Sequence, residues 1–442
     1  MALKIHILSN EYVKPSSPTK DDLKNYELSL LDQLSPNFFL PIIFYYNRED
    51  LAGGDRDDIL SSRLKESLSN ALTMFYPMAG RLKKGDSTVN CNDAGVRYLE
   101  AKVDSNIIDL IEDFRDAKLL DGLIPFTSND GSQGEELLGI QINYFNCGGV
   151  AIGANISHKI VDAFSYITFM SSWAKLSCEG NTTVRPSFVA SSIFPPKENL
   201  GDIHEASSEI IVTRRFVFDA RLIAHVREQA RTKDVREPSR VEAVSSFIWK
   251  HSAGDKPVKQ YIASHAVNLR ARMVPPMPEY AMGNLIGITF ADLDYEESDK
   301  LAIMARKIRE AIRGVDGEFI REIREGEWFA EMAKNMGKMG EQLAKKEAQL
   351  FNFSSWCRFP FYDVDFGIGK PVWVSLASID KGNSAVLVDS KCGQGVEAWW
   401  SEFMGPLKNI HILSNEFITS LPISSSPWFP VYEVDFGMGK PD

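Results

Sequence analysis

His158-Lys159-Ile160-Val161-Asp162 joins a predicted strand to a predicted helix, and the rest of the chain is organised around it. Before this stretch, apolar residues alternate with small or polar ones in the period-two pattern of a half-buried strand: Val150, Ile152, Ala154 and Ile156. After it, apolar residues recur at helical spacing: Ala163, Tyr166, Ile167, Met170, Trp173 and Ala174. Such a junction puts side chains at the rim of a sheet. His158 can therefore face a cleft while rigid elements hold it on both sides, as a general base requires.

A His and an Asp four residues apart also occur together by chance in many chains. In the alternative interpretation, Asp162 only caps the helix and His158 is a buried residue that bonds to the backbone. The spacing alone leaves both interpretations open.

The length and composition indicate a folded protein of two or three domains. The chain has 442 residues, of which 44% are hydrophobic, enough for sizeable cores at roughly 100–200 residues per domain. Its formal net charge of -11 argues against a nucleic-acid partner, because such proteins need clustered Lys and Arg. No apolar run approaches the roughly 20 residues of a membrane span, and the N-terminus lacks the apolar core of a signal peptide. We expect a soluble, monomeric protein of the cytoplasm, without contact to a membrane.

The cysteines and histidines predict neither disulfides nor a metal site. The five cysteines are scattered and lack Cys-x-x-Cys spacing: Cys91, Cys147, Cys178, Cys357 and Cys392. The seven histidines show no ligand spacing with cysteines or carboxylates. We therefore expect no metal and no permanently bound cofactor.

Periodicity outlines further elements of the N-terminal half. It predicts a strand over residues 5–8, a helix with an apolar stripe, and a hairpin in which residues 138–144 turn into the strand before His158. The helical stripe consists of Leu60, Leu64, Leu68 and Leu72. From about residue 177 to 208 the periodicity disappears and Gly, Pro, Asn and Ser accumulate, which predicts a crossover between two domains.

The C-terminal half begins with a strand pattern at residues 215–218, and Asp219 after it is the predicted N-cap of a helix. Ser239 and Glu242 have the spacing of a capping box at the next helix. Residues 297–350 are dense in Lys, Arg, Glu and Ala, which predicts long solvent-facing helices without a site of their own.

Five motifs, in order along the chain, resemble those of the plant BAHD acyltransferases, which use acyl-CoA. They are His158 with Asp162, Asn268-Leu269-Arg270, Ala281-Met282-Gly283-Asn284, Ser355-Trp356-Cys357-Arg358, and the run from Asp365 to Pro371. The resemblance covers about residues 1–400, and within the family the chain looks most like the alkaloid acetyltransferases. Two positions depart from the family pattern: Ala163 stands where Gly is more common, and Ile368 replaces the Trp of Asp-Phe-Gly-Trp-Gly.

Asp365-Phe366-Gly367 is also the metal-binding tripeptide of protein kinases. That interpretation fails, because no His-Arg-Asp catalytic loop, Gly-rich phosphate loop or Val-Ala-Ile-Lys strand accompanies it. In the BAHD family the motif is structural and lies far from the chemistry.

The resemblance implies an α/β fold of two similar chloramphenicol-acetyltransferase-like domains, each a mixed sheet with helices, and a channel at their interface. The expected domains are residues 1–176, which carry His158, and residues 209–406, with the crossover at 177–208. The segment after about residue 363 would pack on the first domain.

The resemblance also implies roles for single residues. His158 would be the general base, and Asp162 would be structural and pair with Arg270 rather than Arg272. CoA would contact Ser355, Trp356 and Arg358. The other motif residues would be structural: Asn268, Gly283, Asn284, Asp365, Phe366, Gly367 and Gly369.

The chemistry expected from these residues is a direct acyl transfer. The sequence holds no Gly-x-Ser-x-Gly nucleophile motif, so we expect a ternary complex and not an acyl-enzyme. The resemblance implies a short acyl-CoA as co-substrate, acetyl-CoA above others, and a hydroxyl of a plant-type specialised metabolite as acceptor, an alkaloid above others. The alternatives are terpenoid or sugar acceptors and a non-catalytic binding paralogue.

The C-terminus repeats two earlier stretches. Residues 410–416 are identical to residues 5–11, and residues 429–441 closely repeat residues 359–371. Two unequally spaced copies exclude a solenoid, so residues 407–442 are interpreted as appended fragments of a neighbouring duplicate. We do not expect His411 and Asp435 to form a second active site.

Overall fold

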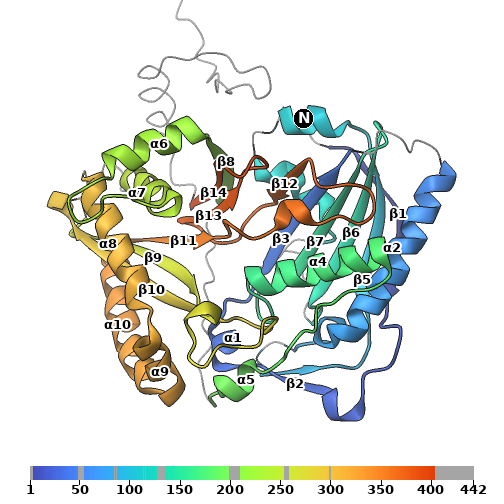
Figure 1. Cartoon of the computed structure of the whole chain (residues 1–442), viewed down its shortest axis with the longest axis horizontal. Coiled ribbons are helices and arrows are strands. Elements are labelled where there is room, and N and C mark those ends of the chain that lie inside the picture. The colour runs from blue at the N-terminus through green and yellow to red at the C-terminus, as the bar shows by residue number, and fades with distance from the viewer. Residues whose placement is uncertain are drawn as a thin grey trace, which may run out of the picture.

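The computed structural model describes residues 3–47, 54–83, 85, 87–112, 114, 116–126, 135–198, 210–252, 258–297 and 300–403. In these ranges two six-stranded sheets lie next to each other, with helices packed around them (Figure 1). The predicted α/β fold with two mixed sheets is confirmed. The repeated stretches within residues 407–442 lie outside the described ranges.

The first sheet comes mainly from the N-terminal half, in the order β1-β5-β6-β7-β3-β12. Its strands are β1 (Ile5–Val13), β3 (Phe39–Tyr46), β5 (Val96–Val103), β6 (Leu138–Phe145), β7 (Val150–Ser157) and β12 (Trp373–Leu376). Only β5 and β6 are parallel neighbours, and the other neighbouring pairs are antiparallel. The predicted hairpin before His158 is the pair β6 and β7.

The second sheet has the order β10-β9-β11-β13-β14-β8. Its strands are β8 (Ile211–Phe218), β9 (Gln260–Asn268), β10 (Ile286–Asp294), β11 (Ala348–Ser355), β13 (Ser384–Asp389) and β14 (Val396–Phe403). Here β11 runs parallel to both β9 and β13. A small separate sheet pairs β2 (Asn25–Glu27) with β4 (Thr88–Asn90).

The described α-helices are α1 (Leu30–Leu34), α2 (Gly54–Met74), α3 (Ile107–Glu112), α4 (Ala163–Glu179), α5 (Ala190–Ile193), α6 (Ala220–Gln229), α7 (Arg240–Ser252), α8 (Leu301–Gly314), α9 (Gly317–Glu325) and α10 (Glu327–Ala344). Short 3-10 helices are η1 (Asp21–Leu23), η2 (Tyr76–Ala79), η3 (Ala117–Leu123), η5 (Arg270–Arg272), η6 (Tyr295–Glu297) and η7 (Phe361–Asp363). None of these helices is both long and apolar enough to cross a membrane.

The strand β7 is buried on both faces, so its predicted half-buried character was wrong. All 8 of its residues are buried. The face with the small residues is covered by η3, where a Cβ on Gly153 would collide with the carbonyl oxygen of Leu123. The side chain of Asn155 is held there, because its Nδ2 donates to Phe126 O at 2.7 Å. Small residues on this face therefore indicate close approach of another segment and not solvent.

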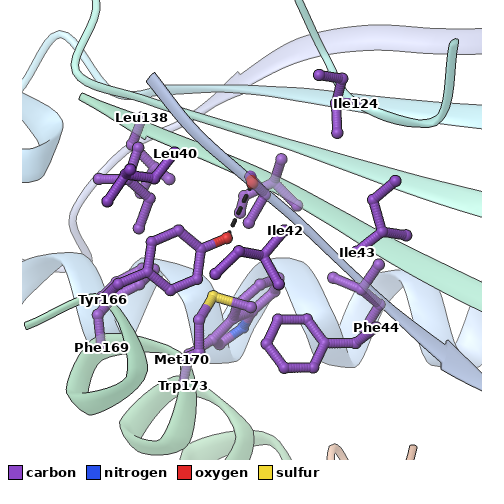
Figure 2. Packing of buried hydrophobic residues seen from close by; sticks show 14 of the residues in the cluster. Leu40, Ile42, Ile43, Phe44, Ile124, Leu138, Tyr166, Phe169, Met170 and Trp173 are labelled. Carbon is purple, nitrogen blue, oxygen red and sulfur yellow. Dashed lines mark hydrogen bonds between the residues drawn. The ribbon is translucent and has the colours of Figure 1, made fainter. Parts of the chain in front are cut away.

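The other face of the first sheet is covered by α4 and α2. Figure 2 shows Tyr166, Phe169, Met170 and Trp173 of α4 against Leu40, Ile42 and Phe44 of β3. Tyr166 donates its hydroxyl proton to Ala154 O at 2.8 Å. The predicted leucine stripe of α2 is confirmed as core, since its four leucines are at most 3% exposed: Leu60, Leu64, Leu68 and Leu72. The element that follows Asp162 is thus anchored over its length.

In the C-terminal half, the predicted cap and capping box are confirmed. Asp219 accepts from Leu222 N at 2.7 Å, and Ser239 and Glu242 exchange backbone-to-side-chain bonds of 3.1 and 2.7 Å. Helices predicted over residues 297–350 are present as α8, α9 and α10, but the prediction was wrong in two details. The strand β11 begins at Ala348, and α8 buries one apolar face in the core: Leu301, Met304, Ala305 and Ile308. The apolar stripe of α8 was overlooked because the opposite face of the helix is rich in charged residues.

Buried polar and aromatic contacts join the two sheets. Trp373 on β12 of the first sheet packs against Trp399 on β14 of the second, with ring centroids 6.2 Å apart. The indole nitrogen of Trp373 donates to Glu397, which also binds Arg215 in a buried pair at 2.7 Å. The expected crossover is described as far as residue 198 and contains α5.

Candidate active site

His158 directly follows β7 and is held from three directions. Its backbone N donates to Phe38 O at 2.8 Å, and its ring meets the Phe38 ring edge-on with centroids 5.2 Å apart. Its Nδ1 lies 2.9 Å from Oδ1 of Asn284, which belongs to the second half of the chain. The residue is half-buried. Burial lowers the pKa of His158, so the imidazole is neutral near pH 7, as a base must be.

The surroundings of Asn284 fix which His158 nitrogen carries the proton. The amide Nδ2 of Asn284 donates to Oδ1 of Asp32 at 2.9 Å and to the carbonyl oxygen of His158 at 2.6 Å. A flipped amide would place its oxygen against these two acceptors. Oδ1 of Asn284 therefore faces His158 and accepts from Nδ1–H. This leaves the lone pair on Nε2 of His158, the nitrogen available to take a proton from a substrate.

Asp162 lies at the start of α4 and bonds away from His158. Its carboxylate accepts from Ser165 N at 2.8 Å, as an N-cap, and from Leu285 N at 3.1 Å. Arg270 donates to both oxygens, at 2.7 and 3.2 Å. Burial alone would raise the pKa of Asp162, but the charge and hydrogen bonds of Arg270 and the backbone donors bring it below its ordinary value.

Arg270 uses its remaining donors on the loop that carries Asn284. Its Nε donates to Ala281 O at 2.9 Å and its Nη2 to Gly283 O at 3.1 Å. The guanidinium also lies over the Phe164 ring, 4.4 Å from the centroid. Asp162 and Arg270 therefore connect the loop bearing His158 to the loop bearing Asn284. Asp162 both caps α4 and bonds Arg270.

Asp32 is a buried residue of this site that sequence reasoning missed. It belongs to α1, is fully buried, and bonds both the backbone N and the side chain of Asn284. The available signal was Ser29 three residues before Asp32, a capping-box spacing inside an apolar run. The structure contains this capping box.

The other predicted site residues lie in varied environments. Trp356 is buried in the core and its Nε1 donates to Ser354 at 3.0 Å, so the indole offers little open surface. Ser355 is half-buried and Arg358 is exposed. Asn268 accepts from the backbone N of Arg270 at 3.0 Å and so shapes the loop at Arg270.

The run from Asp365 to Gly369 forms a self-contained turn. Asp365 Oδ1 accepts from the backbone N of Gly367, Ile368 and Gly369 at 2.7, 3.1 and 3.0 Å. Gly367 and Gly369 have φ of 78° and 89°, which glycine adopts without strain. Phe366 is fully buried against Trp173, with ring centroids 4.7 Å apart. These contacts stabilise the packing of this segment on α4.

Among the described residues no group of three or more His, Cys, Asp or Glu side chains could hold a metal ion. What the geometry offers is an imidazole whose Nδ1 bonds Asn284 and whose Nε2 bonds no residue of the described part of the chain. Such a group can remove a proton from a hydroxyl as it attacks an electrophile.

Comparison with known proteins places this arrangement in a family. The model of the family described as "Transferase family" matches residues 3–401. The chain is 37% identical to vinorine synthase of Rauvolfia serpentina, covering 90% of this chain and 94% of that protein. It is 36% identical to stemmadenine O-acetyltransferase of Catharanthus roseus, covering 95% and 99%, and 34% identical to a limonoid 21-O-acetyltransferase of Melia azedarach, covering 90% and 93%.

Solved structures agree in fold. The crystal structure of vinorine synthase superposes with a TM-score of 0.79 and covers 90% of this chain and 95% of that one. F. sporotrichioides TRI101, solved with coenzyme A and T-2, has a TM-score of 0.65 at 17% identity, covering 86% and 95%. The chain therefore belongs to the transferase family of BAHD acyltransferases and is an acyltransferase.

Proposed function

We propose that this protein transfers an acetyl group from acetyl-CoA to a hydroxyl of a plant specialised metabolite, with His158 as the general base. The observation that carries the proposal is the hydrogen bond between Nδ1 of His158 and Asn284, because it leaves Nε2 as a proton acceptor. The structural neighbour TRI101, solved with coenzyme A, supports an acyl-CoA as co-substrate. The named acetyltransferases among the relatives support acetyl as the acyl group.

The reaction is a direct transfer in a ternary complex. Nε2 of His158 takes the proton of the acceptor hydroxyl while the oxygen attacks the thioester carbonyl carbon. A tetrahedral oxyanion forms and collapses, the carbon–sulfur bond breaks, and the CoA sulfur receives the proton from the imidazolium. The products are an ester and free CoA, and His158 is neutral again.

Asp162 and Arg270 take no part in proton transfer in this proposal. They hold the two loops that bring His158 and Asn284 together, through contacts at 2.7 and 3.2 Å. For CoA we propose contacts near Ser355, Trp356 and Arg358. The exposed guanidinium of Arg358 is suited to a phosphate, and buried Trp356 supports the segment from below.

The favoured acceptor is an alkaloid, because the chain is similar to vinorine synthase and stemmadenine O-acetyltransferase. A terpenoid acceptor is the second candidate, since limonoid acetyltransferases are similar over 90% of this chain. We further propose a monomer in the cytoplasm, without a permanently bound cofactor, and domain boundaries at residues 176 and 209.

The test is incubation of purified protein with acetyl-CoA and panels of alkaloids, limonoids and acylsugar precursors, followed by mass spectrometry for acetylated products. Acetylated alkaloids that disappear with His158→Ala support the proposal. Exclusive acylation of limonoids or sugars contradicts the acceptor class. A preference for malonyl-CoA or benzoyl-CoA over acetyl-CoA contradicts the donor.

A further inference from the structure

Asp32 is a fully buried carboxylate at the site. It belongs to the N-terminal half of the chain, whereas Asn284 belongs to the C-terminal half. Its Oδ1 accepts from Asn284 N at 2.7 Å and from Asn284 Nδ2 at 2.9 Å. Its Oδ2 accepts from Ser29 N at 3.0 Å and from Ser29 Oγ at 2.6 Å. Burial raises the pKa of Asp32, and these uncharged donors counter that effect by stabilising the carboxylate form.

The loop that carries Asn284 comes close to Asp32 because Gly283 has no side chain. Gly283 has φ of 109°, and a Cβ at this position would lie 3.4 Å from both carboxylate oxygens of Asp32. On the other side, Nζ of Lys159 donates to Gln33 O at 2.9 Å, which ties α1 to the stretch that contains His158. The Asp32 carboxylate, the Asn284 amide and the His158 imidazole are therefore held in place by further contacts, in addition to the hydrogen bonds that connect these three groups.

We propose that Asp32 is a positioning residue that acts on His158 through Asn284. The inference rests on the proposed role of His158 as the base. By accepting from Nδ2, Asp32 keeps the amide oxygen of Asn284 turned to His158. The imidazole then holds its proton on Nδ1 and its lone pair on Nε2.

Asp32 also supports the charged form of His158 during the reaction. When Nε2 takes the proton of the acceptor, positive charge appears on the ring and the bond from Nδ1–H to Asn284 strengthens. The carboxylate polarises the amide in the same sense, because hydrogen bonds in a series reinforce one another in a low dielectric. Asp32 thus stabilises the imidazolium without touching it.

The test begins with Asp32→Asn. The new amide has one acceptor oxygen, so it cannot accept from both Asn284 and Ser29 as the carboxylate does. Where its NH₂ group faces Asn284, only the carbonyl oxygen of His158 still holds the Asn284 amide, which can then turn and donate to Nδ1 of His158. We expect the proton to move to Nε2, and kcat to fall by about 10²-fold or more with little change in KM. The ¹⁵N chemical shifts of the His158 ring report the tautomer directly, and its titration should move to lower pH.

A matched control separates this effect from loss of a buried capping carboxylate. Glu242→Gln changes the corresponding residue in the capping box of α7, where Glu242 bonds Ser239 and Arg309. We expect this variant to lose stability but to keep wild-type kcat and the wild-type His158 tautomer. A purely structural role for Asp32 predicts the same result for Asp32→Asn.

A second variant keeps the test decisive if Asp32→Asn does not fold. Asn284→Ala preserves the contacts of Asp32 with Ser29 and removes the connection to His158. We expect a comparable loss of kcat and of the fixed tautomer. Adding Asp32→Asn to Asn284→Ala should lower kcat no further, because Asp32 acts only through Asn284.

The inference is overturned if either single variant keeps the Nδ1–H tautomer, or if Asp32→Asn lowers kcat as strongly in the Asn284→Ala background as in the wild type. His158→Ala distinguishes a failure of the proposed function from a failure of the role of Asp32. If that variant retains activity, the proposed function itself is wrong. If it is inactive while Asp32→Asn remains wild-type in kcat and tautomer, only the role of Asp32 is lost.

Discussion

Arg270 donates two hydrogen bonds to Asp162 across the boundary between the two halves, with both side chains under a tenth exposed. The pair closes the loop that follows β7 onto the loop that precedes β10. A buried ion pair contributes little net stability over an apolar pair, but removal of one partner leaves an uncompensated charge. The pair therefore matters most for the fixed geometry around His158.

Arg270→Met should lower the free energy of unfolding by about 3–5 kcal/mol, because Asp162 then stays buried without its cation. Urea unfolding followed by circular dichroism measures the change. The control is Arg306→Met, which breaks the exposed pair with Glu310 and should cost less than about 1 kcal/mol. An equal effect of the two substitutions would contradict the importance assigned to the buried pair.

His158→Gln should reduce kcat by about 10²–10⁴-fold while the unfolding midpoint stays near wild type. Since burial lowers the pKa of His158 from 6.5, the protonated and inactive form gains population only below pH 6.5. The acid limb of kcat/KM in the wild-type enzyme should therefore lie below pH 6.5. An acid limb above that value would contradict the burial of the imidazole.

Gly283→Ala tests the close approach of the Asn284 loop to Asp32. A side chain at φ of 109° strains the backbone, and the new Cβ would lie 3.2 Å from Cβ of Ala190. We expect a loss of about 1–3 kcal/mol and reduced kcat. Gly337→Ala in α10 is the control, because a Cβ there meets nothing within 4 Å and a helical glycine costs about 0.5–1 kcal/mol relative to alanine. That variant should be more stable than wild type.

His265 predicts a pH-dependent stability that is independent of catalysis. It is buried on β9, no residue in the described ranges hydrogen-bonds its two ring nitrogens, and burial lowers its pKa to about 3. The unfolded chain binds a proton near pH 6.5 and the folded one does not, so the stability contribution is present above pH 6.5 and is lost as the pH falls.

The size of this loss is up to about 1.4 kcal/mol per pH unit below pH 6. His265→Leu should remove that part of the dependence, seen as a growing difference in urea midpoint between variant and wild type from pH 7.5 to 5. His225→Leu, at an exposed position, should show no such trend. A constant difference between His265→Leu and wild type would disprove the idea.

The sequence predicts those parts of the fold that depend on local periodicity. The leucine stripe of α2, the hairpin before His158 and the capping box at Ser239 are local patterns, and each is present. The role of Asp32 was not predictable in this way, because it depends on a contact with Asn284, 252 residues away. The second covered face of β7 was missed for the same reason, since η3 is distant from it in sequence.

The charge-rich stretch before β11 shows a different limit of prediction from the sequence. Its helices were predicted from composition, but which face of α8 is buried depends on the sheet beneath it. The composition of such a helix reflects its many exposed charged residues. Its few buried apolar residues are recognised only from their spacing.

The pairing of β12 with β3 also bears on how the protein is made. Tyr45 on β3 hydrogen-bonds Ser375 on β12, and these residues are 330 positions apart. During synthesis the first sheet stays incomplete until nearly the whole described chain has left the ribosome. Until then β3 is an open edge strand. An open edge strand invites pairing with other chains. The nascent protein therefore exposes the edge of β3 until β12 is available to cover it.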